Sequence, residues 1–189
     1  MGRQPGLSRR HGCLTMAEDE TVVTYLEMQA EPLHLPHAPT PALPKLMLMR
    51  AESPSTGFYR YLYDAVGHTH MWIDRKTLTD EALAAIIQDP EVEVWVVYVA
   101  GQPAGYFEID GRDAPAVVEL VYLGITQDFQ RMGLGKWLLA EAIRACWARS
   151  PERVIVETCT LDGSSALPLY QKMGFTPYDR RTKTITAPD

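Results

Sequence analysis

Cysteine, basic charge and long apolar runs are all scarce in this chain of 189 residues. Its three cysteines, Cys13, Cys146 and Cys159, show neither a disulfide framework nor metal-ligand spacing, which favours a reducing, cytoplasmic setting. Acidic residues number 24 against 18 lysines and arginines, so the basic face of a nucleic-acid-binding protein is not expected. No apolar run approaches the length of a membrane span. We therefore expect neither nucleic acid nor a membrane as a partner.

The composition fits one globular domain, with 46% hydrophobic and 22% charged residues. Because Met16 is followed by an acidic stretch and then a β-rich segment, we expect residues 1–18 to be a disordered extension and residues 19–189 to form the domain. Runs of β-branched and aromatic residues predict strands, and apolar residues at helical spacing predict helices. Strands are expected at residues 21–30, 92–100, 105–110, 116–126 and 153–161, and helices at residues 55–66, 79–90, 138–147 and 164–174.

Two of these regions constrain the architecture further. Five prolines between Pro32 and Pro44 exclude a regular helix or a central strand there, and predict an extended surface connection. The segment at residues 116–126 is apolar almost throughout, which is typical of a strand buried on both faces. It is the best candidate for the centre of the sheet.

A glycine-rich turn, QRMGLGK at residues 130–136, joins this strand to the next expected helix. Its two glycines let backbone N–H groups approach a ligand, and its two basic residues and the helix start favour an anion. A dinucleotide-binding fingerprint would need a glycine at Leu138, and a P-loop would need Ser or Thr at Trp137. Two interpretations remain open at this point, a phosphate-binding turn and a tight turn with no ligand.

The segment LGITQDFQRMGLGKWLL, followed by LPLYQKMGF at residues 167–175, resembles the acyl-CoA-binding core of the GNAT superfamily of N-acetyltransferases. The resemblance covers about residues 92–178. It implies a single α/β (α+β) domain with a mixed, mostly antiparallel sheet flanked by helices on both faces. It also implies that acetyl-CoA is the co-substrate and that an acetyl or other short acyl group passes to a primary amine by direct attack in a ternary complex.

By the same resemblance, the turn holds the pyrophosphate of coenzyme A, and the edge of the central strand pairs with the pantetheine arm as an added strand would. Many superfamily members carry an asparagine seven residues before the tyrosine of LPLYQKMGF, whereas this chain has Gly163 there, beside Asp162. The coenzyme contacts implied by the resemblance are Leu123, Ile125, Gln130, Arg131, Met132, Gly133, Leu134, Gly135 and Lys136.

Acyl transfer to an amine needs a base, because only about one alkylamine in two thousand is neutral at pH 7. Glu119 precedes Gln130 by eleven residues, as the catalytic glutamate does in the histone-acetylating branch of the superfamily. Strand alternation places Glu119 on one face with Val121 and Leu123. The alternative is a glutamate that faces solvent or pairs with a lysine. Glu108 is the reserve base, and a water relay would serve either carboxylate.

Tyr170 matches the tyrosine that protonates the departing thiolate in many members of the superfamily. Without the flanking motif, a tyrosine at this place would be interpreted as core packing. The oxyanion is expected to receive a hydrogen bond from a backbone N–H near residues 123–125. Because Cys159 has no histidine close in the sequence, direct attack is preferred over a covalent cysteine intermediate.

The expected acceptor side is the aromatic segment FYRYLYDAVGHTHMW at residues 58–72. Its helix is apolar or aromatic on two sides, so it is either sandwiched in the core or lines a pocket. His68 and His70 have no carboxylate or cysteine at ligand spacing nearby, so no metal site is expected. Since the first two helices flank the acceptor site in this superfamily, the expected substrate contacts are Tyr59, Tyr63, Trp72 and Glu108.

The preferred acceptor is a small-molecule amine, and a protein lysine or an N-terminal amine is the alternative. A non-catalytic acyl-CoA-binding module is the rival of a different class, because a fold and a cofactor do not name a substrate. A homodimer is compatible with the sequence.

Overall fold

The computed structural model describes residues 18–39, 43, 45–70 and 72–186 of the chain. Its strands are β1 (Glu18–Met28), β2 (Leu46–Arg50), β3 (Val92–Val99), β4 (Gln102–Asp110), β5 (Val118–Ile125), β6 (Val154–Cys159) and β7 (Thr176–Thr186). Its helices are α1 (Thr56–Gly67), α2 (Asp80–Ile87), α3 (Leu134–Trp147) and α4 (Ala166–Lys172), with short 3₁₀ turns η1 (His68–His70) and η2 (Gln127–Phe129). The extension expected at residues 1–18 lies outside the described residues, except for Glu18, with which β1 begins.

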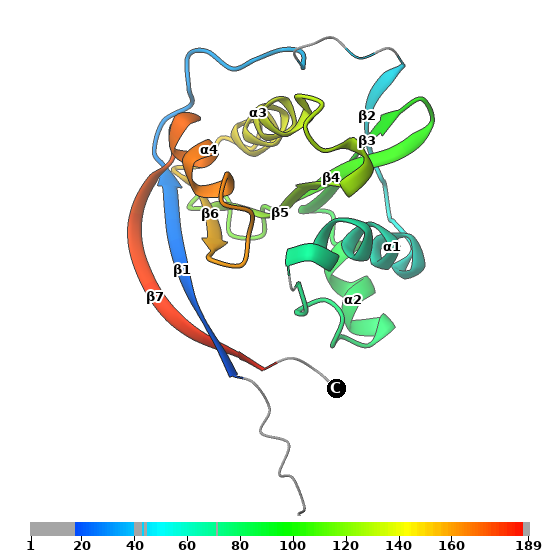
Figure 1. The fold of residues 1–189 in the computed structure, drawn as a ribbon. Helices are drawn as coiled ribbons and strands as arrows, with labels where there is room; N and C mark the ends of the chain where they lie inside the picture. Colours follow the sequence, from blue (N-terminus) through cyan, green and yellow to red (C-terminus); the bar gives the residue numbers. More distant parts are fainter. Residues whose placement is uncertain (1–17, 40–42, 44, 71, 187–189) are drawn as a thin grey trace, which may run out of the picture.

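The strands form one mixed sheet in the order β2-β3-β4-β5-β6-β1-β7. Each neighbouring pair is antiparallel except β5 with β6. In Figure 1, α3 and α4 lie over one face of the sheet, and α1 and α2 lie over the other. The expected fold, a mostly antiparallel sheet with helices on both faces and residues 118–125 at its centre, is confirmed.

Alternating side chains of β4 divide the core into two clusters. Phe107 and Ile109 are fully buried beneath α3, in one cluster with Leu138 of that helix. Tyr106 is fully buried on the opposite face, where it packs in a second cluster with Leu62 of α1. Because side chains alternate between the two faces of β4, each layer of helices packs against its own set of apolar residues.

Local capping starts the two helices on the second face. The Ser55 hydroxyl oxygen accepts a hydrogen bond from the Phe58 N–H at 3.3 Å, and the Thr79 hydroxyl oxygen accepts one from the Ala82 N–H at 3.2 Å. Each bond satisfies an N–H group that the first helical turn leaves without an intrahelical partner. The expected helix starts near residues 55 and 79 are confirmed.

The two edge strands, β2 and β7, were not expected from the sequence. β2 follows the proline-rich segment directly and leaves Met47 and Met49 exposed. β7 is rich in threonine and charged residues and has no apolar alternation. Both strands pair with a neighbour on one side only, so tertiary pairing rather than their own pattern makes them strands.

The connection between β1 and β2 contains no helix or strand at its described residues, 29–39, 43 and 45, as the prolines predict. It passes over α3 in Figure 1. Arg144 of α3 holds it there, because Nη2 donates to the carbonyl oxygens of Leu35 at 3.1 Å and Pro36 at 2.9 Å. None of the helices within the described ranges is long and apolar enough to cross a membrane.

Candidate active site

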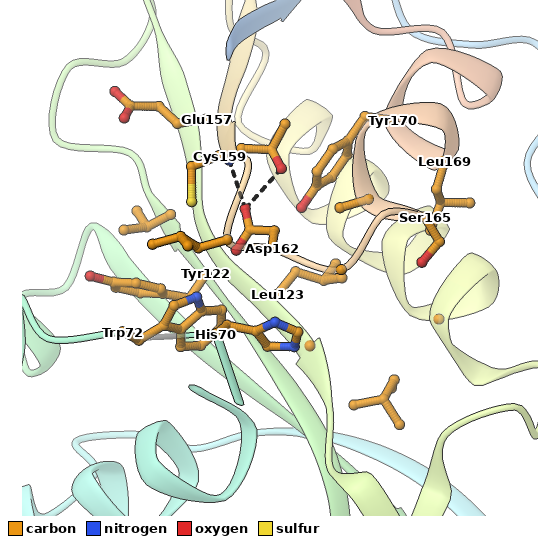
Figure 2. A pocket seen from close by; sticks show the side chains of 18 of the residues that line it. His70, Trp72, Tyr122, Leu123, Glu157, Cys159, Asp162, Ser165, Leu169 and Tyr170 are labelled. Atoms are coloured by element: carbon orange, nitrogen blue, oxygen red, sulfur yellow. Dashed lines mark hydrogen bonds between the residues drawn. The ribbon is translucent and has the colours of Figure 1, made fainter. Parts of the chain in front are cut away.

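A cavity of about 1110 Å³ opens where β5 parts from β6. The two strands pair only at residues 118–120 and 154–156, and further along β5 its β6-facing edge has no strand partner among the residues that the structure describes. The cavity is lined by β5, the start of α3, the end of β6, α4 and the loop after η1 (Figure 2), with further residues from β1 and β7. Small-molecule pockets commonly span about 300–1000 Å³, so this cavity lies slightly above that range.

The expectation that β5 is buried on both faces holds only for its first half. Val118 and Leu120 are buried, whereas residues 121–125 are partly exposed. The reason is the cavity itself, because the apolar residues of this half line an open space instead of a second layer of core.

The glycine-rich turn lines the cavity at the N-terminal end of α3. Gly133 precedes α3 with a φ of +78°, a left-handed conformation that glycine adopts without strain. A Cβ atom added at Gly135 would meet no other atom within 4 Å, so this residue faces open space. Gln130 closes the turn, because its Nε2 donates to the carbonyl oxygen of Ile125 at 3.4 Å. The free N–H groups of the first helical turn and the two basic side chains suit a pyrophosphate.

Most of the predicted coenzyme contacts meet in this cavity. Met132 is the exception, since it does not line the cavity. The predicted residues that do line it are Leu123, Ile125, Gln130, Arg131, Gly133, Leu134, Gly135 and Lys136.

A β-bulge at Val121 changes which residues share a face of β5. Leu120 lies opposite Ile109 and Tyr122 lies opposite Glu108, so Val121 has no partner on β4. The prediction that Glu119 shares a face with Leu123 is therefore wrong, and Val121, as the bulged residue, stands outside the regular alternation. Glu119 points to the α1 side of the sheet with Tyr122, whereas Leu123 packs against the α3 cluster.

Glu119 opens onto the cavity from the first half of β5. Burial is the main cause that raises the pKa of Glu119 above its usual value, and the carboxylates of Glu157, Asp110 and Glu108 raise it further. Glu119 forms no ion pair with any residue in the described ranges. The expected alternative, an ion pair between Glu119 and a lysine, is therefore wrong for the described residues.

Tyr170 enters the same cavity from α4, and Figure 2 shows its hydroxyl pointing toward the interior. Its ring packs edge-on against Phe175, with 5.8 Å between centroids. Burial, followed by the nearby Asp162 carboxylate, raises the pKa of Tyr170 well above its ordinary value. The same carboxylate accepts hydrogen bonds from the Thr158 hydroxyl at 2.8 Å and the Cys159 N–H at 2.9 Å. Asp162 thus fixes the end of β6 beside the tyrosine.

An aromatic wall of Trp72 and Tyr122 closes the opposite side of the cavity (Figure 2). The two ring centroids are 4.9 Å apart. Trp72 reaches this place because Gly67 has no side chain: a Cβ there would lie 2.6 Å from a ring carbon of Trp72. Gly124 similarly lets Val66 of α1 approach β5, since its Cβ would lie 2.2 Å from Val66.

Trp72 is the only one of the four predicted acceptor contacts that the structure brings to the cavity within its described residues. Tyr59, Tyr63 and Glu108 lie behind the aromatic wall and do not line the cavity. Glu108 is fully buried, accepts a hydrogen bond from the Tyr59 hydroxyl and is paired with Arg75 at 2.6 Å. Of the two candidate bases, Glu119 is therefore the carboxylate that a ligand in the cavity can reach.

Sequence reasoning missed several residues that line the cavity, among them Tyr122, Glu157 and Lys183. Lys183 lies on β7, whose sequence gave no strand signal, and its Nζ is 3.5 Å from Glu157 Oε2. Glu157 stands two residues before Cys159 on β6, so alternation alone would have placed both on one face.

Comparisons with known proteins agree with this geometry. A family model described as the Acetyltransferase (GNAT) family matches residues 47–175. Mycothiol acetyltransferase from Arthrobacter sp. (strain FB24) is 35% identical over 65 residues, which are 34% of this chain and 20% of that relative. The match therefore spans about a fifth of the relative's length.

Two solved structures share the fold. An aminoglycoside acetyltransferase from an uncultured soil metagenomic sample is 17% identical with a TM-score of 0.55, over 68% of this chain and 86% of that one. A tandem GNAT protein from the clavulanic acid biosynthesis pathway is 16% identical with a TM-score of 0.62, over 90% of this chain and 55% of that one. Since the family model covers more than half of the sequence, the chain belongs to the GNAT family of acetyltransferases.

Proposed function

We propose that this acetyltransferase moves an acetyl or other short acyl group from acyl-CoA to a primary amine of a small molecule, by direct attack in a ternary complex. One observation carries the proposal: a single cavity holds the start of α3, the unpaired edge of β5, Glu119 and Tyr170. Amine acylation by a thioester needs a base and a proton donor, and an anion-binding turn suits the pyrophosphate of the coenzyme that carries the thioester.

Acetyl-CoA, which the family implies as co-substrate, fits the residues present. Bound there, it supplies an acetyl group activated as a thioester. Gly135 leaves room for the pyrophosphate beside the first N–H groups of α3, which Gly133 starts, and Arg131 and Lys136 add charge. The free edge of β5 at residues 121–125 offers backbone groups to the pantetheine arm.

Glu119 is the proposed base. Its carboxylate takes a proton from the acceptor ammonium, directly or through a water molecule. Because burial and neighbouring carboxylates raise the pKa of Glu119, the carboxylate holds a proton more tightly than an exposed glutamate and is the better base.

Tyr170 is the proposed acid. Its raised pKa keeps the hydroxyl protonated across the physiological range, and no hydrogen bond to a described residue occupies that hydroxyl. We assign its Oη as the donor to the leaving thiolate. Packing of its ring against Phe175 orients the hydroxyl toward the cavity.

The lining of the cavity supports a cationic small-molecule acceptor. Glu119, Glu157 and Asp74 give this end negative charge, which attracts an ammonium group. The aromatic wall of Trp72 and Tyr122 adds faces on which a cation can rest. A relative named for mycothiol and a structural neighbour named for aminoglycosides agree with this class. Free thiols at Cys146 and Cys159 accord with the reducing, cytoplasmic setting that we propose.

The first experiment is calorimetric titration with acetyl-CoA, desulfo-CoA and adenosine diphosphate, followed by thiol release with a panel of amines. The panel contains small primary amines, a lysine peptide with a blocked N-terminus and a peptide with a free N-terminus. Acetyl-CoA binding with turnover of small amines supports the proposal. Turnover of a peptide alone favours the protein-acceptor alternative, and binding without turnover favours a non-catalytic module. Absence of binding to all three ligands would remove the phosphate-binding role of the turn.

A further inference from the structure

We propose that Arg75 is a positioning residue for the acceptor: its guanidinium ties the loop after η1 to a buried carboxylate and thereby holds the aromatic wall of Trp72 and Tyr122 in place. The consequence for catalysis rests on the proposed acetyl transfer, whereas the consequence for the structure does not. Arg75 itself does not line the cavity.

The anchor is a buried charged cluster from three elements. Arg75 Nη2 lies 2.6 Å from Glu108 Oε1, and the side-chain exposures are 14% and 0%. The Tyr59 hydroxyl donates to the other oxygen of the same carboxylate. Glu108 belongs to β4 and Tyr59 to α1, so one carboxylate joins the sheet, the helix and the loop. Removal of one partner alone would leave a buried charge without compensation and would therefore destabilise this attachment of the loop.

The cluster continues directly into the wall. The Arg75 guanidinium carbon lies 5.4 Å from the centroid of the Tyr122 ring, and the backbone N–H of Arg75 donates to the Tyr63 hydroxyl at 3.3 Å. Tyr122 in turn contacts Tyr63 and Trp72, with ring centroids 5.2 Å and 4.9 Å away. The Arg75 side chain therefore contacts Tyr122 of the wall directly, and the Arg75 backbone contacts Tyr63, which lies behind the wall.

A second arginine offers a matched control. Arg149 Nη2 lies 2.8 Å from Glu93 Oε1, with side-chain exposures of 15% and 12%. Like Arg75, it has a buried Nε that finds no partner in the described residues. Arg149 does not line the cavity and follows the end of α3. The two arginines share burial and pairing, and only Arg75 contacts the aromatic wall.

The test compares four purified full-length variants with the wild type. They are Arg75→Lys, Arg75→Met, the double variant Arg75→Met/Glu108→Leu, and Arg149→Met. The double variant removes both charges and so avoids the unfolding that an unpaired Glu108 would cause. Readouts are amide hydrogen exchange over residues 72–78 and 118–125, the acetyl-CoA Kd, and the acceptor KM and kcat for the panel amine with the highest turnover.

We expect faster exchange at residues 72–78 in the double variant and an acceptor KM about tenfold to a hundredfold higher, since small displacements of a positioned group cost rates of that order. Its acetyl-CoA Kd should stay within about twofold of the wild type. Arg75→Lys keeps a charge beside Glu108 and should restore part of the KM. Arg149→Met should lower the unfolding temperature and leave exchange at residues 72–78 unchanged.

A folded double variant with wild-type exchange at residues 72–78 and a wild-type acceptor KM would overturn the proposal. So would an Arg149→Met variant with the same KM increase, because the effect would then be general destabilisation. If no amine is turned over by the wild type, the proposed function fails on that result, and the exchange data alone still decide whether Arg75 holds the wall.

Discussion

The two ends of the cavity are built in different ways. One end, where we propose that the coenzyme binds and which we call the coenzyme end, consists of residues 123–136, a nearly continuous segment whose backbone turns at Gly133 and starts α3. The other, where we propose that the acceptor binds and which we call the acceptor end, is assembled from single side chains that are far apart in the sequence: Trp72 after η1, Glu119 on β5, Glu157 on β6 and Lys183 on β7. A shared co-substrate needs one fixed backbone shape, whereas an acceptor is selected by side chains that each element supplies separately.

The largest effect on activity is expected from substitution of Glu119, the proposed base at the acceptor end. Glu119→Gln keeps the size of the side chain and removes the proton acceptor, so kcat/KM should fall about a hundredfold or more. The acetyl-CoA Kd should not change, because Glu119 does not belong to the turn. Steady-state thiol release and calorimetry measure the two quantities.

Glu152→Gln is the control for that variant, since Glu152 is exposed and outside the cavity. An equal loss of activity in both variants, or an unchanged rate in Glu119→Gln, would take the base assignment away from Glu119.

The next effect tests the proposed proton donor, Tyr170, which reaches the cavity from α4. Tyr170→Phe keeps the ring that packs on Phe175 and removes only the hydroxyl. We expect kcat to fall about tenfold to a hundredfold with little change in the unfolding temperature. A wild-type kcat would show that Tyr170 is core packing and that another group, or water, protonates the thiolate.

The contrast between the ends also explains what could be predicted from sequence. The turn and Tyr170 lie in contiguous motifs, so eight of the nine predicted coenzyme contacts line the cavity. The acceptor contacts depended on which way α1 faces, and Tyr59 and Tyr63 turned out to be buried behind Trp72. A period of two along β5 could not reveal the bulge at Val121, because a bulge is set by pairing with β4.

The missed strands have the same physical cause. β2 and β7 become strands by pairing at the two edges of the sheet, and their own residues show no apolar alternation that would predict it. The sequence could therefore not predict that Lys183 lines the cavity. It could have predicted this for Glu157, because Glu157 lies on β6, which was correctly predicted. Local patterns indicated the central sheet and helices, and long-range pairing decided the edges.

A smaller effect is expected from a substitution that weakens acetyl-CoA binding at the coenzyme end and leaves the acceptor end unchanged. A Cβ atom added at Gly135 meets no protein atom within 4 Å, so we expect Gly135→Val to leave the fold intact. The added methyl groups would stand at the start of α3, where the pyrophosphate is proposed to bind, and we expect the acetyl-CoA Kd to rise about tenfold. Calorimetry measures the Kd, and circular dichroism checks the fold.

Gly57→Val is the matched control, because Gly57 also lies at the start of a helix, α1, with open space around it. Its acetyl-CoA Kd should equal that of the wild type. A Gly135→Val variant that binds as tightly as Gly57→Val would mean that the turn holds no part of the coenzyme.

The smallest effect links charge at the acceptor end to the pH dependence of the reaction. After burial, the carboxylate of Glu157 is the largest cause that raises the pKa of Glu119, followed by Asp110 and Glu108, while Arg75 acts in the opposite direction. Glu157→Gln removes a negative charge, so the ionised form of Glu119 becomes less costly and its pKa falls. Since kcat/KM depends on the ionised base of the free enzyme, the acidic limb of the kcat/KM profile against pH should move to lower pH in Glu157→Gln, whereas Glu152→Gln should leave the limb in place.

The displacement of the acidic limb should shrink at high salt, because Glu157 is partly exposed and its charge is screened. If the limb stays fixed in Glu157→Gln at low salt, the group that titrates is not Glu119, and the acceptor end would act on the amine through shape and contact instead of proton transfer.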